Sequence, residues 1–323
     1  MSPYEKLLPA GGIRLLTINP EDKYPLSLNL QNFPLDKLPE FQALSYTWGK
    51  ATCEDPDTED RNDQSSDHDI TVNGRSFKVK ENLHDVLQHF RQKNETGYLW
   101  IDMICINQKD DLEKAAQIML MHKIYPMAQK VIVWLGKDTS DVDAMLWVES
   151  SFYKILMDAS VANGGRTEYF TQGLGMSHET WENKWQSVDR FIRRRRWFRR
   201  TWVVQECTLG KEVVMKAGDV TLCWRKLAIP LLWANCKLRV NLSSAFNVVH
   251  LEQIRKLHDD GGPMGHELVG HKIACSGVKA SPQQFTLTWT MWSTTLDTFA
   301  RQICATRSTP PLAWPGISSL NTR

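Results

Sequence analysis

Four side chains able to bind a ligand or to take part in catalysis lie between a short apolar run and a charged helical pattern. They are Asp102, Cys105, Asn107 and Gln108, in the segment LWIDMICINQKDDLEKAAQ. Cys105 would be a nucleophile if a base such as His122 lay beside it, and Asp102 would either bind a ligand or cap the loop. A lone cysteine between two isoleucines is far more often a small buried apolar residue. Both interpretations stay open at this stage.

The elements around these residues predict where they lie. Residues 98–101 form an apolar run of strand length, Asp110 and Glu113 have the spacing of a helix capping box, and KVIVWLG indicates a second buried strand. A strand, a helix and a strand at this spacing make a βαβ unit with parallel strands. Because ligands of open α/β sheets bind outside the carboxyl ends of the strands, we expect Asp102 and Asn107 to line a crevice there.

The helix between these strands has a predicted buried face. Its apolar residues recur at helical spacing until Pro126, which is expected to end or kink the helix. The residues expected to be buried are Leu112, Ala115, Ala116, Met119, Leu120, Ile124 and Ala128.

Two earlier segments extend the α/β pattern. FQALSYTWG indicates a strand that ends close to Ser45 and Tyr46. ITVNGRSFKV alternates around Asn73 and Gly74, which is a strong signal for a β-hairpin. Asn82 is the expected cap of the helix that follows. Between these segments, the acidic run at 50–69 is expected to be a solvated loop, and its spacing does not fit a calcium site.

Helices are also expected over residues 141–157 and from about Trp181 onward. The second runs into DRFIRRRRWFRRTWVVQECTLG, where aromatic residues alternate with arginines. This run favours a helix with one packed and one solvated face over a nucleic-acid site. Two strands around Gly218 and a helix interrupted by Pro230 follow.

Net charge and cysteine content exclude several classes of protein. The 323 residues carry a formal charge of +2 at pH 7, so no strong field points to nucleic acid or to a membrane surface. The seven cysteines include no C-x-x-C pair, which argues against a disulfide framework and a zinc site. No apolar run has the length of a membrane span, and neither a G-x-G-x-x-G nor a P-loop motif is present. We expect a cytoplasmic protein without a metal or a resident cofactor.

Five motifs in this order resemble the fungal heterokaryon incompatibility (HET) domain. They are ALSYTWG, VNG-x-x-F-x-V-x-x-NL, LWIDMICINQKD-x-x-EK-x-x-Q-x-x-LM-x-x-IY, VIVWLG and WFRRTWVVQE, and they span residues 41–220. The resemblance implies a role in fungal self/non-self recognition, in which fusion of incompatible strains triggers cell death. It also implies partners, either a second copy of this chain or another incompatibility protein.

The chain departs from the HET pattern in two places. Pro126 stands where many members have arginine, and the ATDPRDKVYALLG type of motif is reduced to Ala305 and Thr306 in ATRSTPPLAWPGISSL. These departures predict a truncated or aberrant C-terminal half.

HET domains are also distantly similar to TIR domains, some of which cleave NAD. This similarity implies that Glu206, in TWVVQE, is the catalytic carboxylate, which would stabilise an oxocarbenium-like ribosyl centre. A tryptophan such as Trp48, Trp100 or Trp202 would stack on a base, and arginines would pair with the pyrophosphate. The full set of expected ligand-binding residues is Ser45, Tyr46, Trp48, Gly49, Asp102, Cys105, Asn107, Arg199, Arg200 and Trp202.

The expected fold is therefore α/β, with a mostly parallel sheet flanked by helices in a TIR-like three-layer arrangement, a β-hairpin insertion and an irregular C-terminal region. The expected domains are an N-terminal extension (1–40), the HET domain (41–238) and a poorly defined C-terminal region (239–323).

Two mechanisms stay open. In the first, the domain is an NAD glycohydrolase, and Ser45, Asp102 and Glu206 converge on one crevice. In the second, it is a non-catalytic adaptor that self-associates through the arginine-aromatic helix, while Glu206 only pairs with arginines one helical turn before it.

Overall fold

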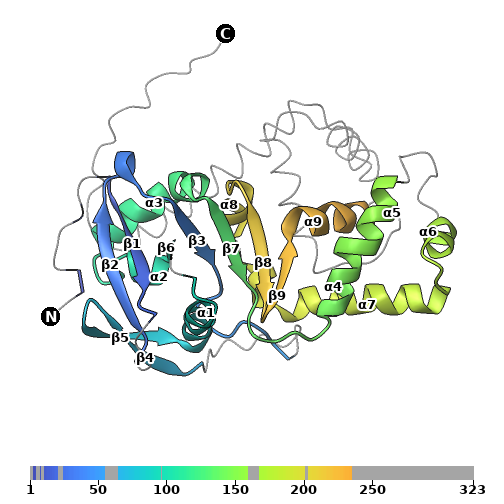
Figure 1. Cartoon of the computed structure of the whole chain (residues 1–323), viewed down its shortest axis with the longest axis horizontal. Coiled ribbons are helices and arrows are strands. Elements are labelled where there is room, and N and C mark those ends of the chain that lie inside the picture. The colour runs from blue at the N-terminus through green and yellow to red at the C-terminus, as the bar shows by residue number, and fades with distance from the viewer. Residues whose placement is uncertain are drawn as a thin grey trace, which may run out of the picture. The chain divides into compact units, whose positions relative to one another are not determined.

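One sheet of nine strands crosses the described part of the chain, in the order β5-β4-β2-β1-β6-β3-β7-β8-β9 (Figure 1). The computed structural model describes residues 3, 4, 8, 11–20, 25–54, 65–95, 97–158, 167–200 and 203–234. The chain divides into two compact units, 1–268 and 269–323, and every described residue belongs to the first. The strands are β1 (Ile13–Ile18), β2 (Ser27–Phe33), β3 (Phe41–Ser45), β4 (Asp67–Val72), β5 (Arg75–Lys80), β6 (Tyr98–Trp100), β7 (Lys130–Trp134), β8 (Val213–Ala217) and β9 (Val220–Cys223).

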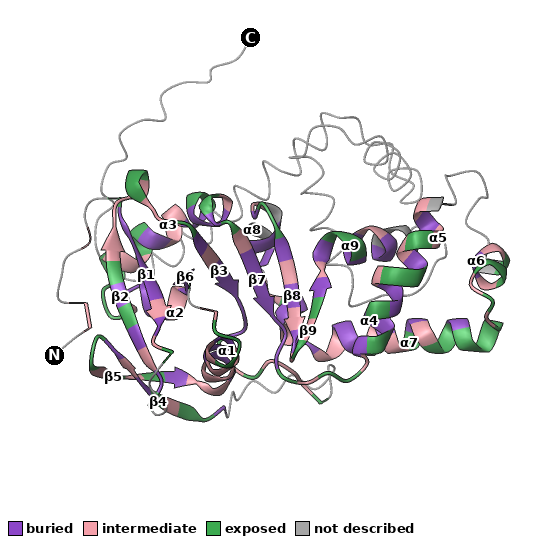
Figure 2. Ribbon diagram, in the orientation of Figure 1, coloured by how far each residue is buried: buried purple, intermediate pink, exposed green. Residues whose placement is uncertain are grey.

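The centre of the sheet is parallel, as expected. β3 lies between β6 and β7 and is parallel to both, and β8 is parallel to β7. Ala43 pairs with Trp100, and Ser45 pairs with Val133. The carboxyl ends of β3 and β6 therefore lie at the same edge of the sheet. Figure 2 shows β3 and β7 buried along most of their length.

The prediction of a mostly parallel sheet was wrong. Among the eight strand pairings of the described residues, four are antiparallel, and these include the two longest, β1 with β2 and β4 with β5. Strands joined by short connections pair antiparallel, because a parallel neighbour needs a long crossover. β1 and β2 lie within the predicted N-terminal extension, yet β1 pairs with β6 in the same sheet. The domain boundaries and the TIR-like layering stay predictions, and the region 239–323 lies outside the described residues.

The hairpin between β4 and β5 is confirmed. Asn73 and Gly74 both have positive φ angles, 51° and 74°, as a two-residue hairpin turn requires. The cap predicted at Asn82 was wrong, because helix α1 (Glu81–Gln92) begins one residue earlier. The Asn82 side-chain amide instead donates to the carbonyl and hydroxyl oxygens of Thr47, at 2.8 and 3.1 Å. It thereby ties α1 to the loop after β3.

Helix α3 (Asp111–Met127) begins at the predicted cap but has a different inward face. The Asp110 side chain accepts hydrogen bonds from the backbone of Leu112 and Glu113, and Pro126 lies in the last turn. The predicted buried stripe was largely wrong, since Leu112 is 80% exposed and Met119 is 42% exposed. Ala115 and Ala116 are also exposed and Leu120 is half-buried, whereas Ile124 and Ala128 are buried as expected.

Polar anchors explain the orientation of α3. Glu113 forms a two-pronged ion pair with the buried Arg14 of β1, at 2.5 and 2.9 Å. One turn later, the Gln117 side chain donates to the carbonyl of Gly12 at 2.8 Å. These contacts turn the face that carries Glu113, Gln117 and Met121 toward the sheet, which leaves the Leu112 face outward.

Helices α4, α5, α6, α7 and α9 lie on the β9 side of the sheet in Figure 1. A cluster of aromatic side chains, Trp147, Phe152, Phe170, Trp181 and Trp185, packs between them. The predicted helix over 141–157 is interrupted by a π-helical segment. The helical elements of the described residues other than α1 and α3 are η1 (Leu35–Lys37), α2 (Asp102–Cys105), α4 (Val142–Trp147), η2 (Val148–Phe152), α5 (Tyr153–Asp158), α6 (Thr167–Gly173), α7 (His178–Arg194), η3 (Arg196–Arg199), α8 (Val203–Thr208) and α9 (Trp224–Trp233).

The arginine-aromatic segment packs its apolar face inward. Phe191, Trp197 and Phe198 are buried. Arg195 is buried as well, where its guanidinium stacks 3.6 Å from the centre of the Phe191 ring and donates to the carbonyls of Phe191, Asp138 and Ser140. These residues support the core of the domain and are not available as an interface.

Candidate functional site

Ser45 and Glu206 meet at the carboxyl edge of the sheet. Ser45 is the last residue of β3, and its hydroxyl donates to the carboxylate of Glu206 in α8. The same hydroxyl oxygen accepts a hydrogen bond from the indole N–H of Trp197 at 2.7 Å. All three side chains are buried, with Glu206 only 2% exposed. Trp197 therefore fixes the Ser45 hydroxyl so that its proton points to Glu206.

Arg200 neutralises the buried carboxylate. Its two terminal nitrogens lie 3.2 and 3.1 Å from the two oxygens of Glu206. Burial lowers the pKa of Arg200, but attraction to Glu206 and Asp102 outweighs this effect and leaves the pKa above its usual value. The guanidinium thus stays charged, and both oxygens of Glu206 have partners.

Asp102 forms the second part of the site, at the start of α2 directly after β6. Its carboxylate accepts hydrogen bonds from the Trp48 indole at 2.9 Å and from the Met103 backbone at 2.7 Å. Burial and then the negative charge of Asp102 raise the pKa of the buried Tyr46 hydroxyl. Burial raises the pKa of Asp102 to about 6, and the negative charge of Glu206 adds to the rise. Trp48 is 43% exposed, so it forms the solvent-facing side of this part.

The charges of the Glu206–Arg200 pair interact with Asp102 and Tyr46. Arg200 and Glu206 both act on the pKa of Asp102, and Arg200, Glu206 and Asp102 all act on the pKa values of Tyr46 and Tyr125. Burial is the largest cause of the rise in both tyrosine pKa values, so both hydroxyls stay protonated. The structure thus brings together Ser45, Tyr46, Trp48, Asp102, Arg200 and Glu206.

Sequence reasoning missed two members of this site. Tyr125 lies on the inward face of α3, and predicting its place would have required the correct rotation of that helix. Trp197 was counted only among the packed aromatic residues. A buried indole N–H usually finds an acceptor, but those of Trp100, Trp134, Trp147, Trp185 and Trp224 have none among the described residues, so the sequence held no specific signal for Trp197.

The other predicted residues lie apart from the Glu206 carboxylate. Cys105 is fully buried, and burial raises the pKa of its thiol to about 12, whereas His122 is exposed on α3. These facts do not support the nucleophile interpretation. The Asn107 backbone donates to Glu113, which makes it part of the α3 anchor. Arg199 is exposed and donates to the Arg193 carbonyl at 3.0 Å.

Three further predictions concern Gly49, Gln108 and the stacking tryptophans. Gly49 is partly exposed in the segment after Trp48. The Gln108 side chain donates to the Asp102 carbonyl at 3.0 Å and supports the turn of α2. Trp100 is fully buried and cannot stack on a ligand, and Trp202 lies outside the described residues.

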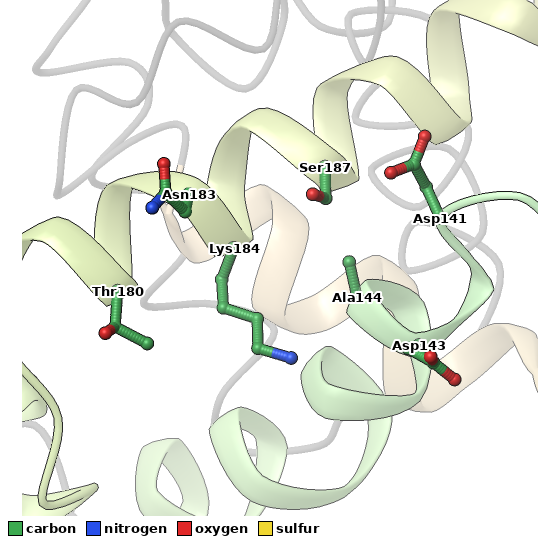
Figure 3. Close-up of a pocket in the computed structure, with 7 residues that line it drawn as sticks. All are labelled: Asp141, Asp143, Ala144, Thr180, Asn183, Lys184 and Ser187. Atoms are coloured by element: carbon green, nitrogen blue, oxygen red, sulfur yellow. The ribbon is translucent and has the colours of Figure 1, made fainter.

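A separate polar pocket of about 390 Å³ lies between α4 and α7 (Figure 3). Asp141, Asp143 and Ala144 form one side, and residues of α7 form the other, with the Lys184 side chain extending between them. Arg190 already pairs with Asp141 at 2.8 Å. This pocket shares no residue with the Ser45–Glu206 site. Within the described ranges, no cluster of three or more metal-binding side chains occurs, and none of the helices is long and apolar enough to cross a membrane.

The fold and the site define an α/β protein that holds a serine, a glutamate and an arginine together at the carboxyl edge of its parallel strands. The family model described as "Heterokaryon incompatibility protein (HET)" matches residues 41–206, about half of the chain. The chain belongs to this family. Ser45 lies near the beginning of the matched region, and Glu206 is its last residue.

A similarity to one fungal protein agrees with this family membership. The chain is similar to "Heterokaryon incompatibility protein 6, OR allele" of Neurospora crassa, with 29% identity over 257 residues. The match covers 65% of this chain but only 34% of the relative, so the chain spans about a third of that protein's length. No solved structure matches the chain.

Proposed function

We propose that this protein acts in heterokaryon incompatibility as an effector of cell death on non-self recognition, and that it does so by cleaving NAD at the Ser45–Glu206 site. Family membership and the name of the similar Neurospora protein support the first part. The buried carboxylate of Glu206 next to a hydroxyl and a guanidinium, at the sheet edge where α/β proteins bind ligands, supports the second. We propose the cytoplasm as its compartment, since Cys53, Cys105 and Cys223 are free thiols.

Cleavage of NAD requires only that one bond breaks and one water molecule adds. The bond between C1′ of the ribose and the nicotinamide nitrogen breaks, and its electron pair leaves with nicotinamide as a neutral molecule. Glu206 stabilises the positive charge that develops at C1′, and a water molecule then adds to C1′ and releases one proton. The products are nicotinamide, ADP-ribose and this proton.

Arg200 couples substrate binding to the exposure of Glu206. In the described conformation both oxygens of Glu206 are occupied, by Arg200 and by Ser45. A pyrophosphate that draws the guanidinium of Arg200 away would free the carboxylate for the ribose. Trp48, on the exposed side, would stack on the base of the substrate.

Release of nicotinamide from NAD by the purified chain tests this proposal. Glu206→Gln should abolish release, whereas Glu212→Gln, which alters an exposed carboxylate paired with Lys130, should not. Trp48→Ala should raise KM more than it lowers kcat, because it removes the stacking surface for the base while Glu206, Ser45 and Arg200 stay in place. Equal background release by the wild type and Glu206→Gln at high protein concentration would end the enzymatic proposal.

A second candidate function is that of a non-catalytic adaptor that self-associates or binds another incompatibility protein. The burial of Glu206 and the exposed apolar face of α3 favour it. Arg195 and the aromatic residues around it are buried, so they form no part of such an interface.

A further inference from the structure

We infer that α3 is a homodimer contact, in which this helix packs antiparallel against α3 of a second copy of the chain. The inference extends the self-association candidate and does not depend on NAD cleavage. Leu112, Met119 and Met127 are 80%, 42% and 40% exposed, and the exposed Ala115 and Ala116 lie between them. Residues at these spacings share one face of a helix.

This concentration of apolar surface is specific to α3. Five large apolar side chains are exposed in the described part of the chain, and three of them are on α3, while Trp48 and Leu146 lie on other segments. Single exposed apolar residues are ordinary, but a continuous exposed stripe is typical of a contact surface.

The helix cannot turn this stripe inward. Glu113 is held by the buried Arg14, and Gln117 is held by the carbonyl of Gly12. Rotating α3 to bury Leu112 would leave the Arg14 guanidinium without its counter-charge inside the protein, which is strongly unfavourable. The stripe can therefore be covered only by a segment outside this helix.

The order of charges along α3 favours a second copy. Asp110 and Asp111 lie at its amino-terminal end, whereas Lys123 lies near the carboxyl-terminal end on the exposed side. Lys114 is two residues from Leu112 and so points away from the stripe. Two parallel copies would place like charges together, but two antiparallel copies place opposite charges together.

A two-fold axis that crosses the paired helices close to residue 117 places opposite charges together and small side chains opposite large ones. It sets Asp111 of one copy opposite Lys123 of the other, and Ala115 opposite Met119, and each contact occurs twice. The small side chains of Ala115 and Ala116 let the helices approach closely, while the aliphatic part of Lys123 covers Leu112.

The dimer should be weak. A helix of 17 residues is about 26 Å long. One such helix pair buries less than the roughly 800 Å² per partner of a standard stable interface. We therefore expect a dissociation constant in the range of about 10 to 100 μM, with monomers at low concentration.

Sedimentation of the full chain over about 1 to 200 μM tests the inference. The wild type should shift from monomer to dimer, and L112E/M119E should weaken the dimer by at least about tenfold. The matched control is L146E, which places the same charge at an exposed apolar position of α4 and should leave the dimer unchanged.

Exchanging the charges of Asp111 and Lys123 tests the proposed contact between these two residues and leaves the apolar side chains unchanged. K123E and D111K should each weaken the dimer, and K123E/D111K should recover most of the lost affinity, because the exchanged charges again meet across the two-fold axis. A wild type that stays monomeric would overturn the inference, as would a monomer destabilised by L112E/M119E, since the stripe would then be covered within the chain. If the chain dimerises and none of these variants changes the dissociation constant, the chain self-associates through a surface other than α3, and the inference is wrong. Nicotinamide release is measured in a separate assay, so a failure of the NAD-cleavage proposal can be told apart from a failure of the α3 dimer.

Discussion

Arg200 and Glu206 form a two-pronged ion pair, with side chains that are 21% and 3% exposed. Arg200 follows η3 and Glu206 lies within α8, so the two residues do not share a helix. The pairing of Glu206 with a preceding arginine is therefore present, but it closes a buried site and is not a pair on the surface of one helix. The pair supports the domain and, in the proposed mechanism, must open for catalysis.

The first prediction concerns the stability of this pair. Glu206→Ala leaves the Arg200 guanidinium without its partner and should lower the free energy of unfolding by about 3 kcal/mol. R200M/E206L removes both charges and should cost less than the sum of the two single substitutions. Urea denaturation followed by circular dichroism measures each value. Additive losses would show that the two side chains do not interact.

The second prediction concerns the pH dependence of stability. The pKa of Asp102 is about 6 in the folded chain, mainly because of burial, against an ordinary value of 3.8. Between about pH 4 and about pH 6 the folded state binds more protons at this group than the unfolded state, so stability should fall as the pH rises through this window. The change should be about 1 to 2 kcal/mol, because Asp102 is only half-buried and solvent screens part of the effect.

Asp102→Asn isolates this effect, since the amide does not titrate but still offers an oxygen to the Trp48 indole. From about pH 4 to about pH 7, the unfolding free energy of the wild type should decrease relative to that of D102N. A difference that is constant with pH would contradict the raised pKa of Asp102.

The third prediction concerns thiol reactivity. Cys105 is buried with a pKa of about 12, whereas Cys53 and Cys223 are partly exposed. In the native chain at about pH 8, iodoacetamide should label Cys53 and Cys223 but not Cys105. Peptide mass spectrometry resolves the individual sites. Rapid labelling of Cys105 in the folded chain would revive its interpretation as a nucleophile.

The fourth prediction concerns the loop after β3. The Asn82 side chain makes two buried hydrogen bonds to Thr47. Asn82→Ala should therefore cost about 1 to 3 kcal/mol, because a buried carbonyl and hydroxyl lose their donor. Thr47→Val removes only the hydroxyl and should cost less. Thermal unfolding of both variants checks the order, and equal losses would assign the whole effect to the hydroxyl.

Local patterns in the sequence determined several elements of this protein. The strands at β3, β6 and β7, the Asn73-Gly74 hairpin and the Asp110 cap were all predicted correctly. Each depends on alternation, turn chemistry or capping, and these act over a few residues of the chain. Placing Ser45 and Asp102 at one sheet edge followed from the same patterns, because parallel strands align their carboxyl ends.

Only the tertiary structure decided the rest. Arg14 and Glu113 are 99 positions apart, and their ion pair sets the rotation of α3 against its apolar pattern. Ser45 and Glu206 are 161 positions apart, and their hydrogen bond depends on how α8 packs against the sheet. Polar contacts between distant segments leave no periodic trace in the sequence, since each side chain alone looks like an ordinary surface residue. Burial makes these contacts strong, and burial exists only once the chain has folded.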